Sequence, residues 1–177
     1  MQFTEFDTRL ARFRVEESPA FLAMLKRHEG ANRAGGRHRA YRCPAGALTI
    51  GWGHNLDAKP LRGLGPDSEI SEAEAESLLR DDLAELAAQL DLRLSWWRGL
   101  GAARSAVLLD MGFNLGLGGL LAFRRMLASA RRQRFDEAAA EMLDSRWAGQ
   151  VGRRACELAA MMRTGRFLPE QCEVLDV

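Results

Sequence analysis

The sequence predicts an α+β protein that is mostly helical, in which a small N-terminal lobe with a β-hairpin joins a larger helical lobe through one long helix. Helical periodicity is absent between Ala31 and Gly65, where glycines, prolines and strand-forming residues predominate. From Ser71 onward, leucines recur about every 3.6 residues and predict a helix of roughly twenty-odd residues, long enough to link two lobes. After Gly101 the pattern is helical almost throughout. A chain of 177 residues suits one compact domain of this kind.

Four segments are expected within that single domain. Residues 1–17 form an N-terminal arm with a weak amphipathic pattern, and residues 18–70 form the small lobe with the hairpin. Residues 71–95 are the connecting helix, and residues 96–177 are the helical lobe. The tail from Pro169 to Val177 is expected to run loosely along the surface.

The first helix of the small lobe is expected to begin at Ser18-Pro19 and to stop at Gly30. Serine is a preferred N-cap, and proline suits the first helical position because its missing N–H would be unsatisfied there anyway. Glycine commonly ends a helix, so Glu29 falls in the last turn.

The next segment is predicted to be a β-hairpin preceded by an arginine-rich loop. Gly35-Gly36, Pro44 and Gly46 break the chain into turns. The residues that favour strands are Tyr41, Thr49, Ile50 and Trp52. A turn-rich exit follows from Pro60 to Pro66.

The long helix should open with a capping box, since Glu74 follows Ser71 by three residues. In the helical lobe we expect Asp136 to cap a helix over Glu137 to Trp147. Breaks between helices are expected at residues 116–119, 135–136, 149–152 and 164–165.

Composition argues against several classes of protein. A net charge of +1 does not favour nucleic acid as a partner, and we see no apolar run of the ~18 residues that a membrane span needs. The polar, acidic N-terminus does not resemble a signal peptide. Cys43, Cys156 and Cys172 lack paired spacing, so we expect free thiols, no zinc or other metal, and Cys156 as a small buried residue.

Charge is nevertheless distributed unevenly along the chain. Residues 26–42 and 124–134 are rich in basic side chains, whereas residues 67–91 are strongly acidic. Such regions could steer an acidic polymer, but an ordinary solvated surface is the commoner explanation.

Glu29 is the first candidate for chemistry. The negative end of the helix dipole disfavours its ionised form, and burial beneath the hairpin would raise its pKa further, whereas the nearby arginines act in the opposite direction. A carboxyl group that stays protonated near neutral pH suits a general acid. Taken alone, a glutamate in this position is usually an ordinary surface residue.

The residues after Glu29 carry a resemblance to a known family. Cys43, five residues, Thr49 and then Ile50-Gly51-Trp52-Gly53-His54 are similar to the active-site hairpin of the phage-type lysozymes, glycoside hydrolase family 24. Further runs occur in family order over roughly residues 20–167: residues 111–116, 134–139, 145–147 and 163–165. The resemblance implies a lysozyme-like fold.

The resemblance also implies catalytic roles. Glu29 would protonate the leaving glycosidic oxygen, and Thr49 would hold the attacking water. Cys43 occupies the place of the family's aspartate or cysteine. A neutral thiol is a poor base, so we assign Cys43 to positioning, with a buried small residue as the alternative. The family inverts the anomeric configuration, so water would enter opposite the acid.

Other residues are assigned by the same resemblance. His54 is expected to be structural and to pair with Asp82, and Arg154 is expected to pair with the catalytic glutamate. Arg146 is a further supporting residue. The residues expected to line the sugar groove between the lobes are Phe113, Asn114 and Leu56. Phe113 could instead be a core residue, and Trp52 and Trp147 are expected to pack rather than to stack on sugars.

One departure from the family stands out. Thirteen residues separate Glu29 from Cys43, where the family usually has about eight, so the extra segment from Asn32 to Ala40 must bulge outward. We hypothesise that its arginines, Arg33, Arg37 and Arg39, attract an anionic cell wall.

The implied function is that of a peptidoglycan hydrolase, a muramidase that cleaves β-1,4 bonds between N-acetylmuramic acid and N-acetylglucosamine without a cofactor. We expect a monomer that binds glycan strands, with no nucleic acid and no membrane anchor. As an endolysin it would be made in the host cytoplasm and would reach the wall through a holin or a secretion machine. The alternatives are a catalytically weak glycan-binding module, a secreted antibacterial effector with the same chemistry, and, on scattered arginines alone, a nucleic-acid-binding helical protein.

Overall fold

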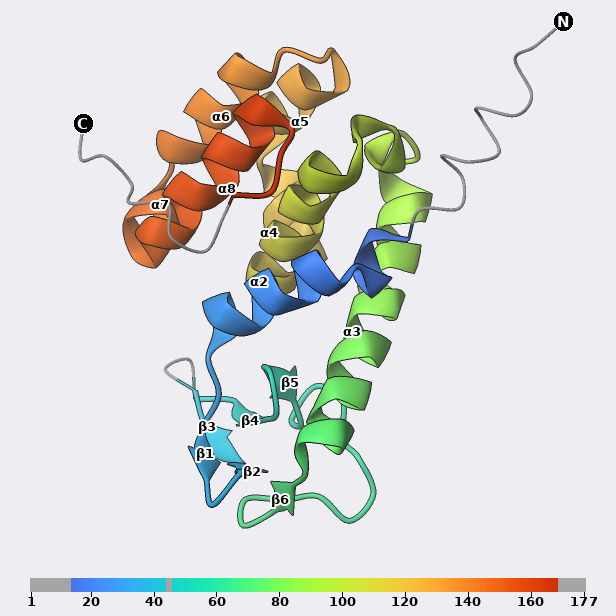
Figure 1. Ribbon diagram of the computed structural model, residues 1–177, viewed down its shortest axis with the longest axis vertical. Helices are drawn as coiled ribbons and strands as arrows, with labels where there is room; N and C mark the ends of the chain where they lie inside the picture. Colours follow the sequence, from blue (N-terminus) through green and yellow to red (C-terminus); the bar gives the residue numbers. More distant parts are fainter. Residues whose placement is uncertain (1–13, 44–45, 169–177) are drawn as a thin grey trace, which may run out of the picture. The chain divides into compact units, whose positions relative to one another are not determined.

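The structure, a computed structural model of the chain, describes residues 14–43 and 46–168. The chain divides into two compact units (Figure 1). The small unit is Phe21–Glu85, and the large unit combines the chain up to Ala20 with the chain from Leu86 onward. The fold is mostly helical with small antiparallel sheets, as the sequence predicted.

The helix that leads into the small unit is α2 (Pro19–Glu29). It begins and ends where the sequence predicted, with Ser18 before its first residue and Gly30 after its last. Gly30 adopts a φ of +60°, and its N–H donates to the carbonyl of Lys26 at 3.1 Å. This left-handed conformation suits glycine and explains why the helix ends at Glu29.

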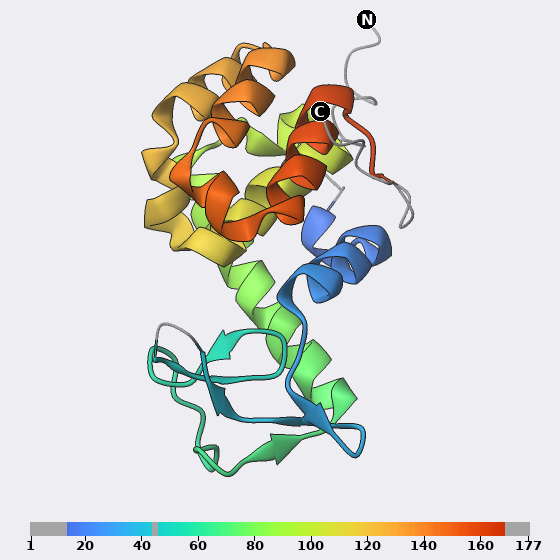
Figure 2. The ribbon, with the colours of Figure 1, turned by 90° about the vertical axis from the view of Figure 1, so that its left-hand side faces the viewer.

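Two three-stranded antiparallel sheets follow α2. One has the order β1 (Arg33–Ala34), β2 (Arg37–Arg39) and β6 (Glu69–Ile70). The other has the order β3 (Tyr41–Arg42), β4 (Leu48–Ile50) and β5 (His54–Asn55). Figure 2 shows both sheets beside the N-terminal end of α3 (Glu72–Arg93).

The arginine-rich segment, expected as a loop, is therefore a hairpin. Gly35 and Gly36 lie between β1 and β2 with φ values of +57° and +77°. Positive φ at both central residues is what a tight two-residue hairpin turn requires, and glycine supplies it without steric cost. The strands escaped prediction because each is only two or three residues long, too short to show alternation.

The helix α3 begins with the predicted capping box. The backbone N–H of Ser71 donates to Glu74 Oε2 at 2.7 Å, and the N–H of Glu74 donates to Ser71 Oγ at 3.2 Å. The helix runs for 22 residues, and the small unit holds it as far as Glu85. Gly51, at φ +65°, brings the β4–β5 turn against α3, because a Cβ there would lie 3.4 Å from the Cβ of Ala75.

The large unit is built from helices around a buried core. They are η1 (Val15–Glu17), η2 (Trp97–Leu100), α4 (Ala102–Ala122), α5 (Arg124–Arg131), α6 (Phe135–Leu143), α7 (Arg146–Val151) and α8 (Arg153–Thr164). Helix α8 packs against α4, α6 and α7, and α5 packs against α6 (Figure 1). Leu108, Leu109 and Met111 of α4 are fully buried at the centre.

Within the described residues, α4 is long and apolar enough to cross a membrane by length and composition, contrary to the expectation from the sequence. Half of that apolar stretch is buried inside the protein. Gly116, at φ +71° and ψ 162°, also interrupts the helical backbone. These features agree with the core helix of a folded domain.

The predicted cap at Asp136 is wrong. Helix α6 begins one residue earlier, at Phe135, and ends at Leu143, so Asp136 lies inside its first turn. Ser145 caps a separate helix, α7, by accepting a hydrogen bond from the N–H of Ala148 at 3.1 Å. An acidic residue in a first turn still stabilises the helix dipole, which accounts for the misplaced start.

The cysteines and the chain ends differ in part from what the sequence predicted. Cys43 and Cys156 are free thiols, but Cys156 is half-buried rather than buried as expected. Of the predicted N-terminal arm, Val15–Glu17 form η1, and residues 1–13 lie outside the described residues. Cys172 and the predicted tail also lie outside them.

Candidate active site

Glu29 is the last residue of α2. Its side chain is half-buried, and its Oε1 atom is buried. The last turn of α2 also carries Lys26, Arg27 and His28. Glu29 is thus a partly desolvated carboxyl group at the negative end of a helix, as the sequence predicted.

The β3–β4 hairpin carries the thiol and the hydroxyl. The N–H of Cys43 donates to Ala47 O at 2.9 Å, and the N–H of Gly46 donates to Cys43 O at 2.8 Å, so these bonds fix the backbone of Cys43 at the turn. Thr49 lies in β4 and is only 5% exposed. Its hydroxyl donates to Ala47 O at 3.2 Å, which uses its single proton and leaves its lone pairs to accept.

Tyr41 is paired with one candidate residue, Thr49, and is influenced electrostatically by two others, Cys43 and Glu29. It is paired with Thr49 across β3 and β4. Burial raises the pKa of Tyr41, and the charges that Cys43 and Glu29 carry when ionised raise it further. Because charge interactions weaken with distance, Cys43 and Glu29 each lie within electrostatic range of Tyr41. From the sequence, Tyr41 was predicted only to favour a strand.

His54 has a structural setting. It is 6% exposed, its Nδ1 lies 2.8 Å from Asp82 Oδ2, and its Nε2 lies 3.1 Å from Lys59 O. The Lys59 ammonium also contacts Asp82, at 3.0 Å, and Glu85, at 2.8 Å. Burial acts to lower the pKa of Lys59, but the hydrogen bonds to Glu85 and Asp82 raise it above its ordinary value. The group ties the hairpin to α3.

Trp52, next to the candidate residues in sequence, is a packing residue. It is 7% exposed. The guanidinium of Arg33 lies 4.5 Å from its ring centroid, the Lys26 ammonium lies 5.4 Å from it, and the His38 ring packs edge-on at 5.1 Å. With both cations near its face, this ring supports the inserted hairpin through cation–π contacts.

The arginines of the inserted hairpin form ion pairs. Arg33 contacts Glu72 at 2.9 Å, and Arg39 contacts Glu69 at 2.5 Å. Arg37 lies 3.6 Å from Glu69. We call these three arginines the hairpin arginines. Their charge is offset locally by β6 and α3, which weakens the expected attraction to an anionic wall.

The remaining candidate residues differ in exposure. In the large unit Phe113 is half-buried, and the exposed Asn114 accepts a hydrogen bond from Trp147 Nε1 at 2.8 Å. Arg146 is exposed. In the small unit, Leu56 is 5% exposed, so little of its side chain could touch a sugar.

Arg154 has a buried partner within the large unit. Its Nε donates to Asp110 Oδ1 at 2.8 Å, and the two side chains are 8% and 0% exposed. The pairing of Arg154 with Glu29 that the resemblance implies would join the two units and stays a prediction, as does the groove between the lobes.

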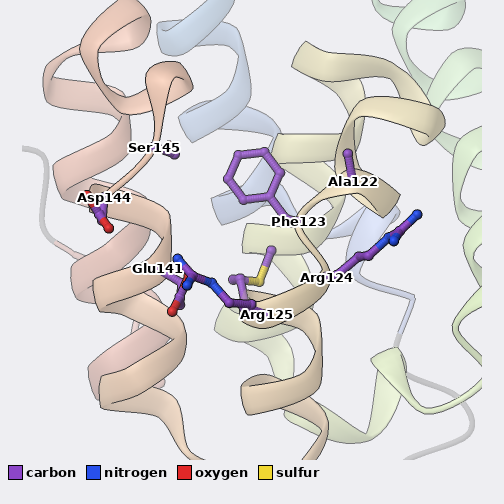
Figure 3. A pocket seen from close by; sticks show the side chains of 8 residues that line it. Ala122, Phe123, Arg124, Arg125, Glu141, Asp144 and Ser145 are labelled. Carbon is purple, nitrogen blue, oxygen red and sulfur yellow. The ribbon is translucent and has the colours of Figure 1, made fainter.

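The large unit also has a pocket of about 280 Å³ (Figure 3). The side chains that line it come from the end of α4 through the start of α5 and from the α6–α7 junction: Ala122, Phe123, Arg124, Arg125, Met126, Glu141, Asp144 and Ser145. At its rim Arg125 Nε lies 2.8 Å from Glu141 Oε2. None of the three predicted catalytic residues lines it.

Comparison with known proteins identifies what this chain is similar to. Residues 28–163 match the family model described as phage lysozyme. The chain is 26% identical to the pre-baseplate central spike protein Gp5 of Enterobacteria phage T4, over 91% of this chain and 31% of that protein. It is 34% identical to an endolysin of Acyrthosiphon pisum secondary endosymbiont phage 1, over 41% of this chain and 42% of the endolysin.

A third relative is matched over most of its length. The chain is 25% identical to the probable T4-type lysozyme 1 of Dictyostelium discoideum, over 80% of this chain and 92% of that protein. By contrast, the alignments span less than half the length of the spike protein and of the endolysin.

Proposed function

The chain belongs to the phage lysozyme family, and from this premise we propose that it is a peptidoglycan hydrolase. The bond cleaved is the β-1,4 link between N-acetylmuramic acid and N-acetylglucosamine, and the role is lysis of the bacterial wall as an endolysin. The observation that supports the proposal is the pairing of Tyr41 with Thr49 across β3 and β4, together with the influence of Cys43 and Glu29 on the pKa of Tyr41. A carboxyl group, a thiol and a hydroxyl in one place suit hydrolysis by an acid and an ordered water.

Glu29 is the general acid. Its carboxyl proton passes to the glycosidic oxygen as the bond from that oxygen to the anomeric carbon breaks, and the freed sugar leaves as an alcohol. The position of Glu29 supports this role, because it holds the carboxyl group partly out of water at the C-terminal end of α2, the negative end of the helix dipole. Solvent then returns a proton to Glu29.

Thr49 positions the nucleophile. The Thr49 hydroxyl donates its proton to Ala47 O, so a water beside Thr49 Oγ1 must donate a hydrogen bond to that oxygen. The lone pairs of the water then point away from Thr49. With one lone pair directed at the anomeric carbon, the water attacks opposite the departing oxygen and inverts the configuration. Its surplus proton leaves to solvent. The Cys43 thiol is a weak hydrogen-bonding group and fills space beside the water.

The substrate is a glycan strand of peptidoglycan, and Phe113 and Asn114 of the large unit are proposed to contact it. The protein is proposed to act as a monomer after release from the cytoplasm through a holin-like pore or a secretion machine. No cofactor takes part in the proposed chemistry, because the proton comes from Glu29 and the nucleophile is water.

The test is clearing of a peptidoglycan suspension by purified protein. Glu29→Gln keeps the shape of the side chain but has no acidic proton, so we expect clearing to slow by about 100- to 10,000-fold. The matched control is Glu137→Gln on the surface of α6, which should clear as fast as the wild type. Equal clearing by the wild type and Glu29→Gln would contradict the role of Glu29. Binding without clearing by both would instead support a glycan-binding module.

A further inference from the structure

We propose that Tyr41 is a further catalytic residue, whose hydroxyl holds the attacking water together with the hydroxyl of Thr49. The inference rests on the proposed function, since it adds a residue to the same site. It also gives a role to the one tyrosine in the chain.

The strand register places Tyr41 beside Thr49. Tyr41 in β3 and Thr49 in β4 are direct partners in an antiparallel pair. Side chains of directly opposed residues lie on the same face of a sheet with Cβ atoms about 4.5–5.5 Å apart. The phenol and the hydroxyl therefore share one face of the hairpin. Cys43 follows just after the end of β3.

The Tyr41 hydroxyl is available to a ligand. The contacts of the described residues include no hydrogen bond between this hydroxyl and a protein group, and the side chain is only half-buried. Burial and the nearby acidic groups raise its pKa above the ordinary value, so the hydroxyl keeps its proton throughout the neutral range. Tyr41 thus offers an O–H donor that no acceptor among the described residues occupies.

This donor supplies what Thr49 and Cys43 lack. Thr49 receives a hydrogen from the water but has no free proton to give, because its proton goes to Ala47 O. A thiol is a weak donor and a weak acceptor. The Tyr41 O–H can donate to the second lone pair of the water, so the two hydroxyls hold it from two sides. Two anchors fix the direction of attack, and one anchor leaves the water free to rotate.

Kinetics test the shared water. Tyr41→Phe removes only the hydroxyl and keeps the ring, so we expect kcat to fall about tenfold, the usual worth of one neutral hydrogen bond, with KM and thermal unfolding unchanged. Thr49→Val is the matched removal of the other anchor. If both hydroxyls hold one water, Tyr41→Phe together with Thr49→Val should slow the reaction less than the product of the single effects.

Titration tests the geometry without using activity. With a single tyrosine in the chain, the NMR signal of ring-labelled tyrosine reports Tyr41 alone. We expect its pKa to lie above the ordinary value and to fall in both Glu29→Gln and Cys43→Ala, because each substitution removes a nearby acidic group. This readout is the same whatever the substrate of the protein is.

The possible results separate the two proposals. If Glu29→Gln abolishes clearing but Tyr41→Phe clears like the wild type, the role of Tyr41 is wrong and the proposed function stands. If the Tyr41 and Thr49 effects simply multiply, the two hydroxyls do not share a water and the inference also fails. If Glu29→Gln clears normally, the proposed function fails, and the titration still shows whether Tyr41 lies beside Glu29 and Cys43.

Discussion

The large unit holds two ion pairs with a buried carboxylate, whereas the hairpin arginines of the small unit form surface pairs. The buried carboxylates are those of Asp110, which pairs with Arg154 at 2.8 Å, and Glu16, which is 2% exposed and pairs with Arg98 at 3.0 Å. In the small unit the hairpin arginines pair with glutamates at the surface. Breaking a buried pair strands a charge away from water, whereas a surface pair contributes about 0–1 kcal/mol. Burial, and not the number of charges, therefore determines how much stability is lost when a pair is broken.

The two basic stretches of the sequence also differ, in whether their arginines are paired with carboxylates. The hairpin arginines are offset by Glu69 and Glu72. On α5 and just after it, the exposed Arg124, Arg131 and Arg132 form no ion pair within the described part of the chain. All three are exposed, whereas Met126, Leu127 and Ala130 of the same helix are buried. Two stretches that look alike in sequence therefore present different net charge to a partner.

The largest effect on stability should come from Asp110→Asn. The substitution leaves the 8%-exposed guanidinium of Arg154 facing a neutral amide, and breaking a buried pair in this way costs about 3–5 kcal/mol. Urea unfolding measures the loss. Arg39→Gln, which breaks a surface pair with Glu69, is the control and should cost about 1 kcal/mol or less. Similar losses for the two variants would contradict the comparison between the units.

An intermediate effect is expected at Glu16. Burial acts to raise its pKa, but hydrogen bonds from Arg98, from its own backbone and from Arg14 outweigh burial and hold the pKa below the ordinary value. A carboxyl group with a lowered folded-state pKa stabilises the fold above its unfolded-state pKa, and that stability is lost as the pH falls through the folded-state value. Glu16→Gln should lower the unfolding free energy at pH 7 by about 1.5–3 kcal/mol.

The pH dependence gives the sharper result. Below about pH 4 the wild type loses the contribution of Glu16, so the unfolding free energies of wild type and Glu16→Gln should converge. Urea unfolding at several pH values measures this. A constant difference between the two proteins from pH 7 down to pH 3 would mean that the carboxylate does not contribute through its charge.

The smallest effects should come from the basic stretches. Arg33→Gln, Arg37→Gln and Arg39→Gln combined, and Arg124→Gln, Arg131→Gln and Arg132→Gln combined, remove equal charge from the two surfaces. We expect the α5 variant to lose more binding to sedimented cell walls at low salt, because its arginines carry unopposed charge. A greater loss for the hairpin variant would support the original assignment of wall attraction to the inserted segment.

Local signals explain how much of the fold could be predicted. The ends of α2 and the start of α3 depend on neighbouring residues, Ser18-Pro19 and Ser71 with Glu74, and both were predicted correctly. The start of α6 was missed because Asp136 is a good N-cap by residue type, although the structure places it within the first turn. The β1–β2 hairpin was missed because its strands are too short to show alternation, and its pairing with β6 and its ion pair with α3 join residues distant in sequence.

The candidate site depended on different information. Nothing local distinguishes Glu29 from other helix-ending glutamates, so its role came from the resemblance and remains a proposal. Tyr41 escaped notice because its importance lies in the pairing with Thr49, and strand register is set by tertiary contacts. The available signal was the spacing of two residues between Tyr41 and Cys43 beside a predicted strand.

In the proposed reaction, Glu29 gives a proton to the glycosidic oxygen while a water held at Thr49 attacks from the opposite side. The most direct measurement is the anomeric configuration of the freshly released product, followed by NMR before mutarotation. We expect net inversion, with the new sugar hydroxyl in the α configuration. Net retention would require a covalent intermediate or attack from the side of the leaving group, and it would contradict the account.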